Sequence, residues 1–345
     1  MATDIPVTRS DEPCLEAVVA AKLTSVAQAE ARLIGADLRS QPLRDLAPDP
    51  DEDSVFVDDK RHSFTSPDMA DRFLRGIASP EDVIHLPVPG PVSREQHAQY
   101  ALARTLRVIR QAGSDMLPGL AVFGQGDGLS HRQRGSAIKG CLRKKEPFAV
   151  VKPFDSLDRF LGFYGEDTFA SVAIVARGLQ HVAISVATGS TVAVGSHQVA
   201  LVQRDGSTWI RMSELSDLPV LHGSITAPLG TPIGDEVESS AFFPESGNAT
   251  LLNGILLGGI EAAYQPDCWP WDVAASYIAA AAGRTVVRTS GGTRSRRRPP
   301  LTAPGVLDTL IKALLEGDKV PGLVVARGQL AAHRLINHLR QGGIA

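Results

Sequence analysis

Apolar residues recur every three or four positions between residues 12 and 38, and this spacing predicts an amphipathic α-helix. The same spacing predicts a second amphipathic helix over 93–112. Prolines and aspartates crowd residues 41–92 between them, so we expect an irregular segment there, with one short helix near 67–77. Both amphipathic helices need an apolar surface to cover, and the rest of the chain must provide it.

The pattern changes to that of strands over residues 148–212. Apolar residues alternate or run without interruption in segments separated by glycine-containing turns. Residues 247–287 then predict a helix, a strand and another helix. The chain closes with a predicted helix at 304–316, a buried strand at 322–328 and a last helix. This order predicts mixed sheets layered with helices.

Composition narrows the possible functions. A net charge of −3 and an aromatic content of 5% argue against a dedicated nucleic-acid binder. The three cysteines are far apart and form no CxxC pair, so we expect no disulfide framework and no zinc site, and a reducing, cytoplasmic location. Because no signal-peptide core and no apolar run of roughly 18 residues occurs, we also expect no membrane association.

Three segments resemble the inositol monophosphatase-like superfamily of Mg²⁺-dependent, lithium-sensitive phosphomonoesterases. Residues 268–286, CWPWDVAASYIAAAAGRTV, are similar to the family's W-D-[IV]-A-A-G signature and the helix after it. Residues 247–264 are similar to the helix and strand that precede this signature. Residues 149–195 are similar to the family's D-P-[IL]-D-G-T strand end and its next two strands. The resemblance covers about 92–345 and implies a layered αβαβα sandwich of the α+β or α/β class, with an irregular N-terminal insertion.

This resemblance and the changes in composition divide the chain into four parts. We expect an N-terminal helix packed on the body in 1–40 and a Pro/Asp-rich insertion in 41–92. An α+β sheet subdomain is expected in 93–215, and a C-terminal α/β subdomain in 216–345.

The resemblance also implies a cluster of carboxylates around Mg²⁺, and this chain departs from it. The family's helix acid falls near Gln96, and a glutamate of its G-E-E loop becomes Gln125, with Asp127 two residues on. The first aspartate of D-P-[IL]-D becomes Lys152. Two acids of the pattern remain, Asp155 and Asp272.

Further positions of the family's site have changed chemical type. Leu157 stands in place of a threonine that positions the attacking water, and Gln265 in place of a glutamate that contacts inositol hydroxyls. The resemblance therefore implies a ligand-binding site without its catalytic set, in which Lys152 is the one candidate catalytic residue. The expected ligand-binding residues are Lys152, Asp155, Ser156, Asp272, Gln265 and Asn248.

Lys152 gives the strongest prediction about chemistry. Mg²⁺ prefers several oxygen ligands, so an ammonium beside Asp155 and Asp272 would compete for the same space and repel the ion. The ammonium could instead face a phosphate group. Residues 128–145 carry six Lys or Arg residues and no acid, which predicts a basic edge to the site.

Three hypotheses about function follow. In the first, the protein has lost hydrolysis, needs no cofactor and binds a phosphorylated small molecule or a protein partner through Lys152, with a homodimer plausible by analogy. In the second, Asp127, Asp155 and Asp272, helped by Glu146, hold Mg²⁺ for an active phosphatase of sugar phosphates or nucleotide bisphosphates. In the third, Lys152 is the base or nucleophile of a metal-free enzyme.

Simpler interpretations stand beside these hypotheses. Asp155 and Asp272 also suit helix N-termini, and Lys152 suits an internal salt bridge. The glycine-rich segment 124–128 is interpreted as a surface loop, with a phosphate cradle as the alternative. The basic run 294–300 is interpreted as a solvated loop, with a polyanion contact as the alternative.

Overall fold

The computed structural model describes most of the chain. It covers residues 13–38, 43–44, 54–57, 60–63, 92–154, 170–188, 190–194, 200–204, 209–214, 224–228, 231, 242–245, 254–257, 259–289 and 299–343. The short helix expected near 67–77 and the basic residues 294–298 lie outside these ranges. The four-part division of the chain stays a prediction.

A seven-stranded sheet forms the first half of the body, in the order β11-β10-β9-β8-β7-β6-β5. Its strands are β5 (Ala121–Gly124), β6 (Phe148–Lys152), β7 (Ser171–Ala176), β8 (Val182–Thr188), β9 (Ser190–Val194), β10 (Ala200–Arg204) and β11 (Ile210–Arg211). Neighbouring strands are antiparallel except β5 and β6, which are parallel. The carboxyl ends of β5 and β6 therefore meet at one edge of the sheet.

A five-stranded sheet forms the second half, in the order β13-β12-β14-β16-β15. Its strands are β12 (Ile225–Pro228), β13 (Phe242–Glu245), β14 (Ala262–Gln265), β15 (Thr285–Arg288) and β16 (Leu323–Ala326). The first three in the order are parallel, and β16 is antiparallel to both of its neighbours. Two short pairs lie apart: β1 (Leu43–Arg44) with β4 (Val92–Ser93), and β2 (Ser54–Val57) with β3 (Lys60–Ser63).

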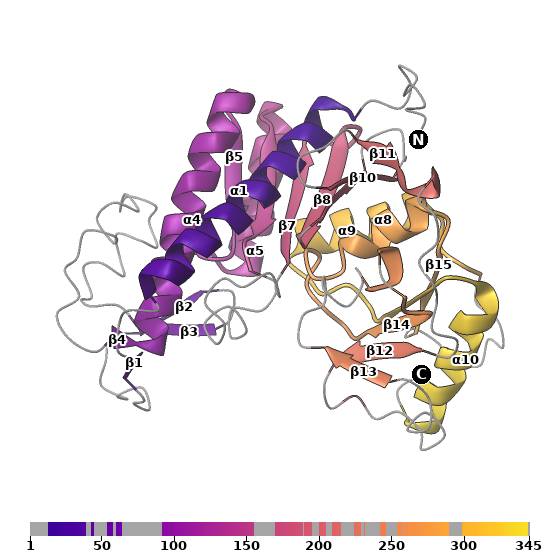
Figure 1. The fold of residues 1–345 in the computed structure, drawn as a ribbon. Coiled ribbons are helices and arrows are strands. Elements are labelled where there is room, and N and C mark those ends of the chain that lie inside the picture. Colours follow the sequence, from indigo (N-terminus) through magenta and orange to yellow (C-terminus); the bar gives the residue numbers. More distant parts are fainter. Residues whose placement is uncertain are drawn as a thin grey trace, which may run out of the picture.

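Helices cover both sheets and fill the space between them (Figure 1). On the outer face of the seven-stranded sheet lie α1 (Leu15–Leu38) and α4 (Arg94–Met116). Between the sheets is a middle layer of α5 (His131–Lys144), α8 (Ala275–Ala281) and α9 (Ala303–Glu316). The outer face of the five-stranded sheet is covered by α10 (Gln329–Gln341). These five layers confirm the predicted αβαβα sandwich.

Strands β6, β7 and β8 of the large sheet are mostly apolar and buried along their length because both faces are covered. In β6, Val150 faces the middle layer and Val151 faces α1 and α4, and all six residues of β7 are buried. Continuous apolar runs are typical of strands in such a position.

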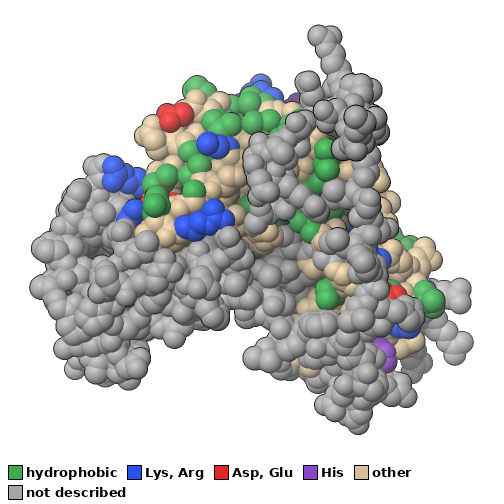
Figure 2. Space-filling model, in the orientation of Figure 1, with side chains coloured by type: hydrophobic (Ala, Val, Ile, Leu, Met, Phe, Trp, Pro, Cys, Tyr) green, Lys and Arg blue, Asp and Glu red, His purple; other side chains and the backbone are tan. Residues whose placement is uncertain are grey.

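On the side seen in Figure 2, hydrophobic and basic side chains lie over the α1–α4 layer. Among the described side chains of α1, the exposed large apolar residues are Leu15, Val18 and Leu33.

The three cysteines are free thiols, as their spacing predicts. Burial raises the pKa of Cys141 in α5, and the nearby charge of Glu146 adds to this effect. Among the helices within the described ranges, none is long and apolar enough to cross a bilayer.

Two glycines of α5 provide a matched test of how closely the middle layer is packed. A methyl group at Gly135 would lie 2.6 Å from the carbonyl oxygen of Leu315 in α9, whereas no described atom lies within 4 Å of one at Gly140. Because alanine favours helices over glycine, we expect Gly140→Ala to raise the free energy of unfolding by about 0.5–1 kcal/mol. Gly135→Ala should instead lower it by about 1–3 kcal/mol through overpacking. Urea unfolding of both variants measures the difference, and changes of the same sign would contradict this packing.

Candidate functional site

The segment Gly124–Leu129 connects β5 to α5 at the carboxyl end of the parallel β5–β6 pair. Gln125 continues β5, and its backbone N–H donates to the Val151 carbonyl at 3.2 Å. Ser130 then begins α5 with a capping box. The backbone N–H of Gln133 donates to the Ser130 hydroxyl, and the backbone N–H of Ser130 donates to the side-chain oxygen of Gln133. The segment is therefore fixed at both ends.

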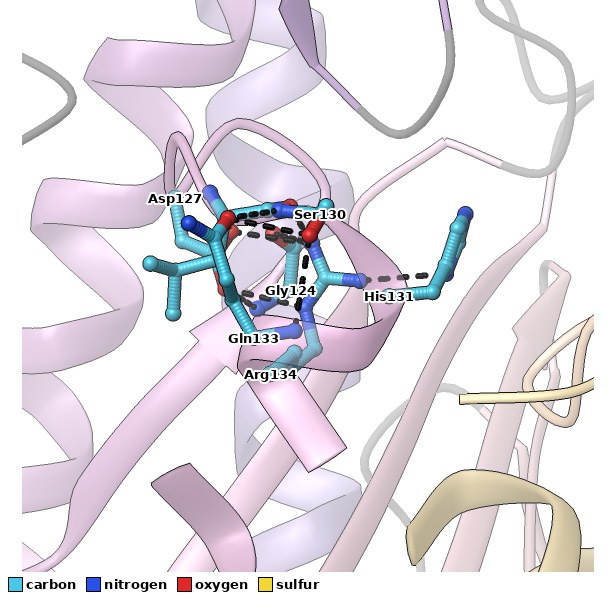
Figure 3. Close-up of polar contacts among 7 residues, drawn as sticks. Gly124, Asp127, Ser130, His131, Gln133 and Arg134 are labelled. Carbon is cyan, nitrogen blue, oxygen red and sulfur yellow. Dashed lines mark hydrogen bonds and ion pairs between the residues drawn. The ribbon is translucent and has the colours of Figure 1, made fainter. Parts of the chain in front are cut away.

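Asp127 and Arg134 form a buried ion pair inside this turn (Figure 3). The Arg134 Nε donates to Asp127 Oδ2 at 3.0 Å and its Nη2 donates to Oδ1 at 2.9 Å. The backbone N–H groups of Gly124 and Leu129 also donate to this carboxylate, at 2.8 and 2.9 Å. The side chains of Arg134 and Asp127 are 1% and 2% exposed. A bidentate pair of this kind is the geometry that a guanidinium makes best.

The prediction of a surface loop at 124–128 is therefore wrong. Gln125 and Asp127 are only 6% and 8% exposed, because the carboxylate draws the turn around the buried Arg134 instead of facing water. Arg134 also differs from the expected basic edge, since its charge is directed inward. Other basic residues of the segment are exposed on α5 and just after it, namely Arg132, Lys139, Arg143, Lys144 and Lys145.

An aromatic stack joins the start of α5 to residues 269–271. The His131 ring lies on the Trp269 ring with centroids 3.3 Å apart and planes inclined by 12°, and it also stacks on Trp271 at 5.1 Å. The Arg134 guanidinium lies 5.0 Å from the Trp271 ring centroid, and Lys319 lies 5.7 Å from that of Trp269. Both distances are within the range of cation–π attraction.

Lys152 and Asp272 form the second ion pair of the site. The Lys152 ammonium donates to Asp272 Oδ1, and the backbone N–H of Trp269 donates to Oδ2 at 3.3 Å. The two side chains are 12% and 10% exposed. Since Asp272 directly follows Trp271, the aromatic stack and this ion pair belong to one short segment of chain.

Register shows that Lys152 and Gln265 both face the middle layer, from opposite sheets. Lys152 pairs with Val172 and Gln265 pairs with Leu323, and both apolar partners belong to the core between the sheets. Residues directly opposite in an antiparallel pair lie on the same face. Gln265 is fully buried, and within the described part of the chain neither atom of its amide has a hydrogen-bond partner. A buried amide is normally hydrogen-bonded, so a ligand or a water molecule is expected to bind this one.

Comparisons with known proteins find structural similarity at low sequence identity. No family model and no curated protein matches the sequence. A calcium-bound IMPase family protein from Staphylococcus aureus has a TM-score of 0.46 and 11% identity over 79% of this chain and 93% of its own. An inositol monophosphatase from Zymomonas mobilis has a TM-score of 0.43 and 12% identity over 79% and 94%. Inositol monophosphatase II from S. aureus MSSA476 has a TM-score of 0.42 and 16% identity over 70% and 83%.

The chain is structurally similar to inositol monophosphatase family proteins.

The structure brings some of the predicted residues together and leaves others outside its described ranges. Asp127 and Asp272 lie at the two ends of the Arg134–Trp271 contact. Asp155, Ser156, Leu157 and Asn248 lie outside the described residues, so their roles stay predictions. Glu146 is exposed before the start of β6, where it pairs with Lys144 at 4.0 Å, and is thus separated from Lys152 by the length of the strand.

The described carboxylates do not fit a Mg²⁺ ion as they stand. Asp127 accepts four hydrogen bonds from protein donors, and Asp272 accepts from Lys152 and Trp269. Within the ranges that the structure covers, no group of three His, Cys, Asp or Glu side chains could hold a metal ion. A dication would have to displace a cation of the protein at either acid.

Sequence reasoning missed Arg134, His131 and the two tryptophans as partners. The motif Ser130-x-x-Gln133 is a capping-box signal and could have located the start of α5. No local signal shows that Trp269 and Trp271 lie against this helix, because the contact joins residues more than 130 positions apart.

Proposed function

We propose that this protein binds a phosphorylated small molecule at the Lys152–Asp272 site without Mg²⁺-dependent hydrolysis. The observation that carries the proposal is the Lys152 ammonium seated on Asp272. A fixed cation there supplies the positive charge that a metal ion would otherwise bring to a phosphate. It also removes the carboxylate from the set of available metal ligands.

Charge and solvation support the loss of hydrolysis. Mg²⁺ needs near-octahedral oxygen coordination at close range, and an ammonium on the same carboxylate both fills space and repels the ion. A metal ion activates water only if it has a coordination position open for that water. With Lys152 on Asp272 and Arg134 on Asp127, the described part of the site provides no such position.

Binding of a phosphoryl group agrees with where Lys152 lies. The residue ends β6 and keeps 12% of its side chain exposed, and we propose that a small anion contacts this exposed part. Gln265 has a fully buried amide on the face of the other sheet that lies toward the middle layer, and its place in the proposed ligand-binding set rests on the sequence. Asp155, Ser156 and Asn248 complete the proposed ligand-binding set on sequence grounds alone.

The other hypotheses gain no support from the geometry. An active phosphatase needs Asp127 and Asp272 free of their cations, and both acids are paired. A nucleophilic or basic lysine must be neutral, whereas pairing with a carboxylate favours the ammonium form. On sequence grounds we also propose a homodimer and a cytoplasmic location. A protein partner is the alternative to the small molecule, also on sequence grounds.

Calorimetric titration with inorganic phosphate tests the proposed binding. We expect the wild-type protein to bind phosphate and Lys152→Met to bind it about 10- to 100-fold more weakly, since a charge-assisted hydrogen bond is lost. Lys139→Met is the matched control, because Lys139 is exposed on α5, and it should bind as the wild type does. The proposal is contradicted if the wild type binds no phosphate, or if both variants bind alike.

A further inference from the structure

Five acceptor atoms converge on the guanidinium of Arg134. They are the two carboxylate oxygens of Asp127 at 2.9 and 3.0 Å, the carbonyls of Gly124 and Leu129 at 3.2 and 3.0 Å, and Nδ1 of His131 at 3.3 Å. Because a guanidinium has only donors, the His131 Nδ1 accepts this hydrogen bond.

These acceptors are gathered around a single cation. Two are the oxygens of a carboxylate and two are backbone carbonyls, and all point their negative ends into a volume that is nearly closed to water. Buried acceptors of this kind are costly unless a positive group satisfies them. The arrangement is that of a cation site built from oxygen and nitrogen ligands, and its occupant is a side chain of the same protein.

The guanidinium also determines how two parts of the site lie relative to each other. Gly124 and Leu129 stand at the two ends of the turn, and a single nitrogen, Nη2, bonds to the carbonyls of both. The same group also lies over the ring of Trp271, which is followed by Asp272. Figure 3 shows the turn around Arg134, with His131 on its other side.

We propose that Arg134 is an internal cation that organises the Gly124–Leu129 turn and positions it against residues 269–272. The turn therefore needs no external ion. In this role Arg134 is a positioning residue. An effect of Arg134 on phosphate binding rests on the proposed function. The shape of the turn itself does not depend on that function, so the two can be tested apart.

Chemical rescue tests the internal cation directly. Arg134→Ala removes the guanidinium and leaves the acceptors, so free guanidinium at low millimolar concentration should bind in its place. We expect guanidinium to raise the thermal midpoint of the variant by about 2–5 °C at a concentration tenfold above its dissociation constant. It should also shift the tryptophan emission toward that of the wild type, since Trp271 lies under the bound cation.

Matched controls separate this rescue from general salt effects. Methylammonium and sodium at the same ionic strength should give no rescue, because neither reproduces the planar fork. Arg132→Ala removes an exposed arginine of the same helix and should not respond to guanidinium, and the same holds for the wild type. Equal responses in Arg134→Ala and Arg132→Ala, or no response in either, would overturn the proposal.

Arg134→Lys keeps the proposal testable if the alanine variant fails to fold. An ammonium cannot reach all five acceptors, so the amides of Gly124 and Leu129, which donate to Asp127, should exchange hydrogen at least about tenfold faster than in the wild type. Unchanged protection would overturn the proposal. If the turn positions the proposed ligand site, Arg134→Ala should also bind inorganic phosphate more weakly than the wild type. Phosphate affinity that stays low while guanidinium restores the turn would contradict only this link to the proposed function.

Discussion

Asp127→Ala is expected to lower the free energy of unfolding by roughly 3–5 kcal/mol, the largest loss of stability that we predict for a single substitution here. The alanine leaves the Arg134 guanidinium buried with only carbonyl and imidazole acceptors around it. It also removes the acceptor for the backbone N–H groups of Gly124 and Leu129. Urea unfolding monitored by circular dichroism measures the loss.

An exposed ion pair near the other end of α5 is the control for this prediction. Glu146 pairs with Lys144 at 4.0 Å, with side chains 48% and 71% exposed, and Glu146→Ala should change the free energy of unfolding by less than about 0.5 kcal/mol. The double variant Asp127→Ala/Arg134→Met should be more stable than Asp127→Ala alone, because it removes the unpaired charge. A double variant less stable than Asp127→Ala would show that Arg134 stabilises the turn without its carboxylate.

Lys152→Asp is expected to give the protein an affinity for divalent cations that the wild type lacks. The substitution removes the ammonium from Asp272 and places a second carboxylate near it, so that two hard oxygen donors face the same space. We expect Ca²⁺ and Mg²⁺ to bind in the range of about 0.1–1 mM, typical of weak, partly hydrated sites. Each ion should raise the thermal midpoint of this variant.

Lys152→Ala separates the two parts of this prediction. It frees Asp272 but adds no carboxylate, so divalent cations should stabilise it less than Lys152→Asp. Equal stabilisation of the two variants would show that the new acid contributes no ligand. No response in either variant would show that Lys152 is not what keeps ions from Asp272.

The layers of the fold could be predicted because they depend on local patterns. Helices α1, α4, α9 and α10 and most strands of the large sheet follow from the spacing of apolar residues, which reports the faces they bury. Strand β5 and helix α5 were not predicted. The four residues of β5 are too few for a clear period, and α5 carries five exposed basic residues on or beside it that masked its buried stripe of Arg134, Ile138 and Cys141.

The site could be predicted only where the resemblance named a position. It placed Lys152 and Asp272 in one site, and the structure shows their ion pair across 120 positions of sequence. Arg134 is one of six Lys or Arg residues in the eighteen-residue segment 128–145, and nothing in the sequence distinguishes it from the other five. Its burial depends on Asp127, Trp271 and the packing of α5 against α9, which are tertiary facts.

Calorimetric titration of the purified wild-type protein with Mg²⁺, together with a phosphate-release assay on sugar phosphates and nucleotide bisphosphates, tests the central claim most directly. With organic cations on Asp127 and Asp272, we predict no stoichiometric Mg²⁺ binding and no Mg²⁺-dependent release of phosphate. Tight binding of one or more ions per chain, with turnover that is lost in Asp272→Ala, would contradict the account.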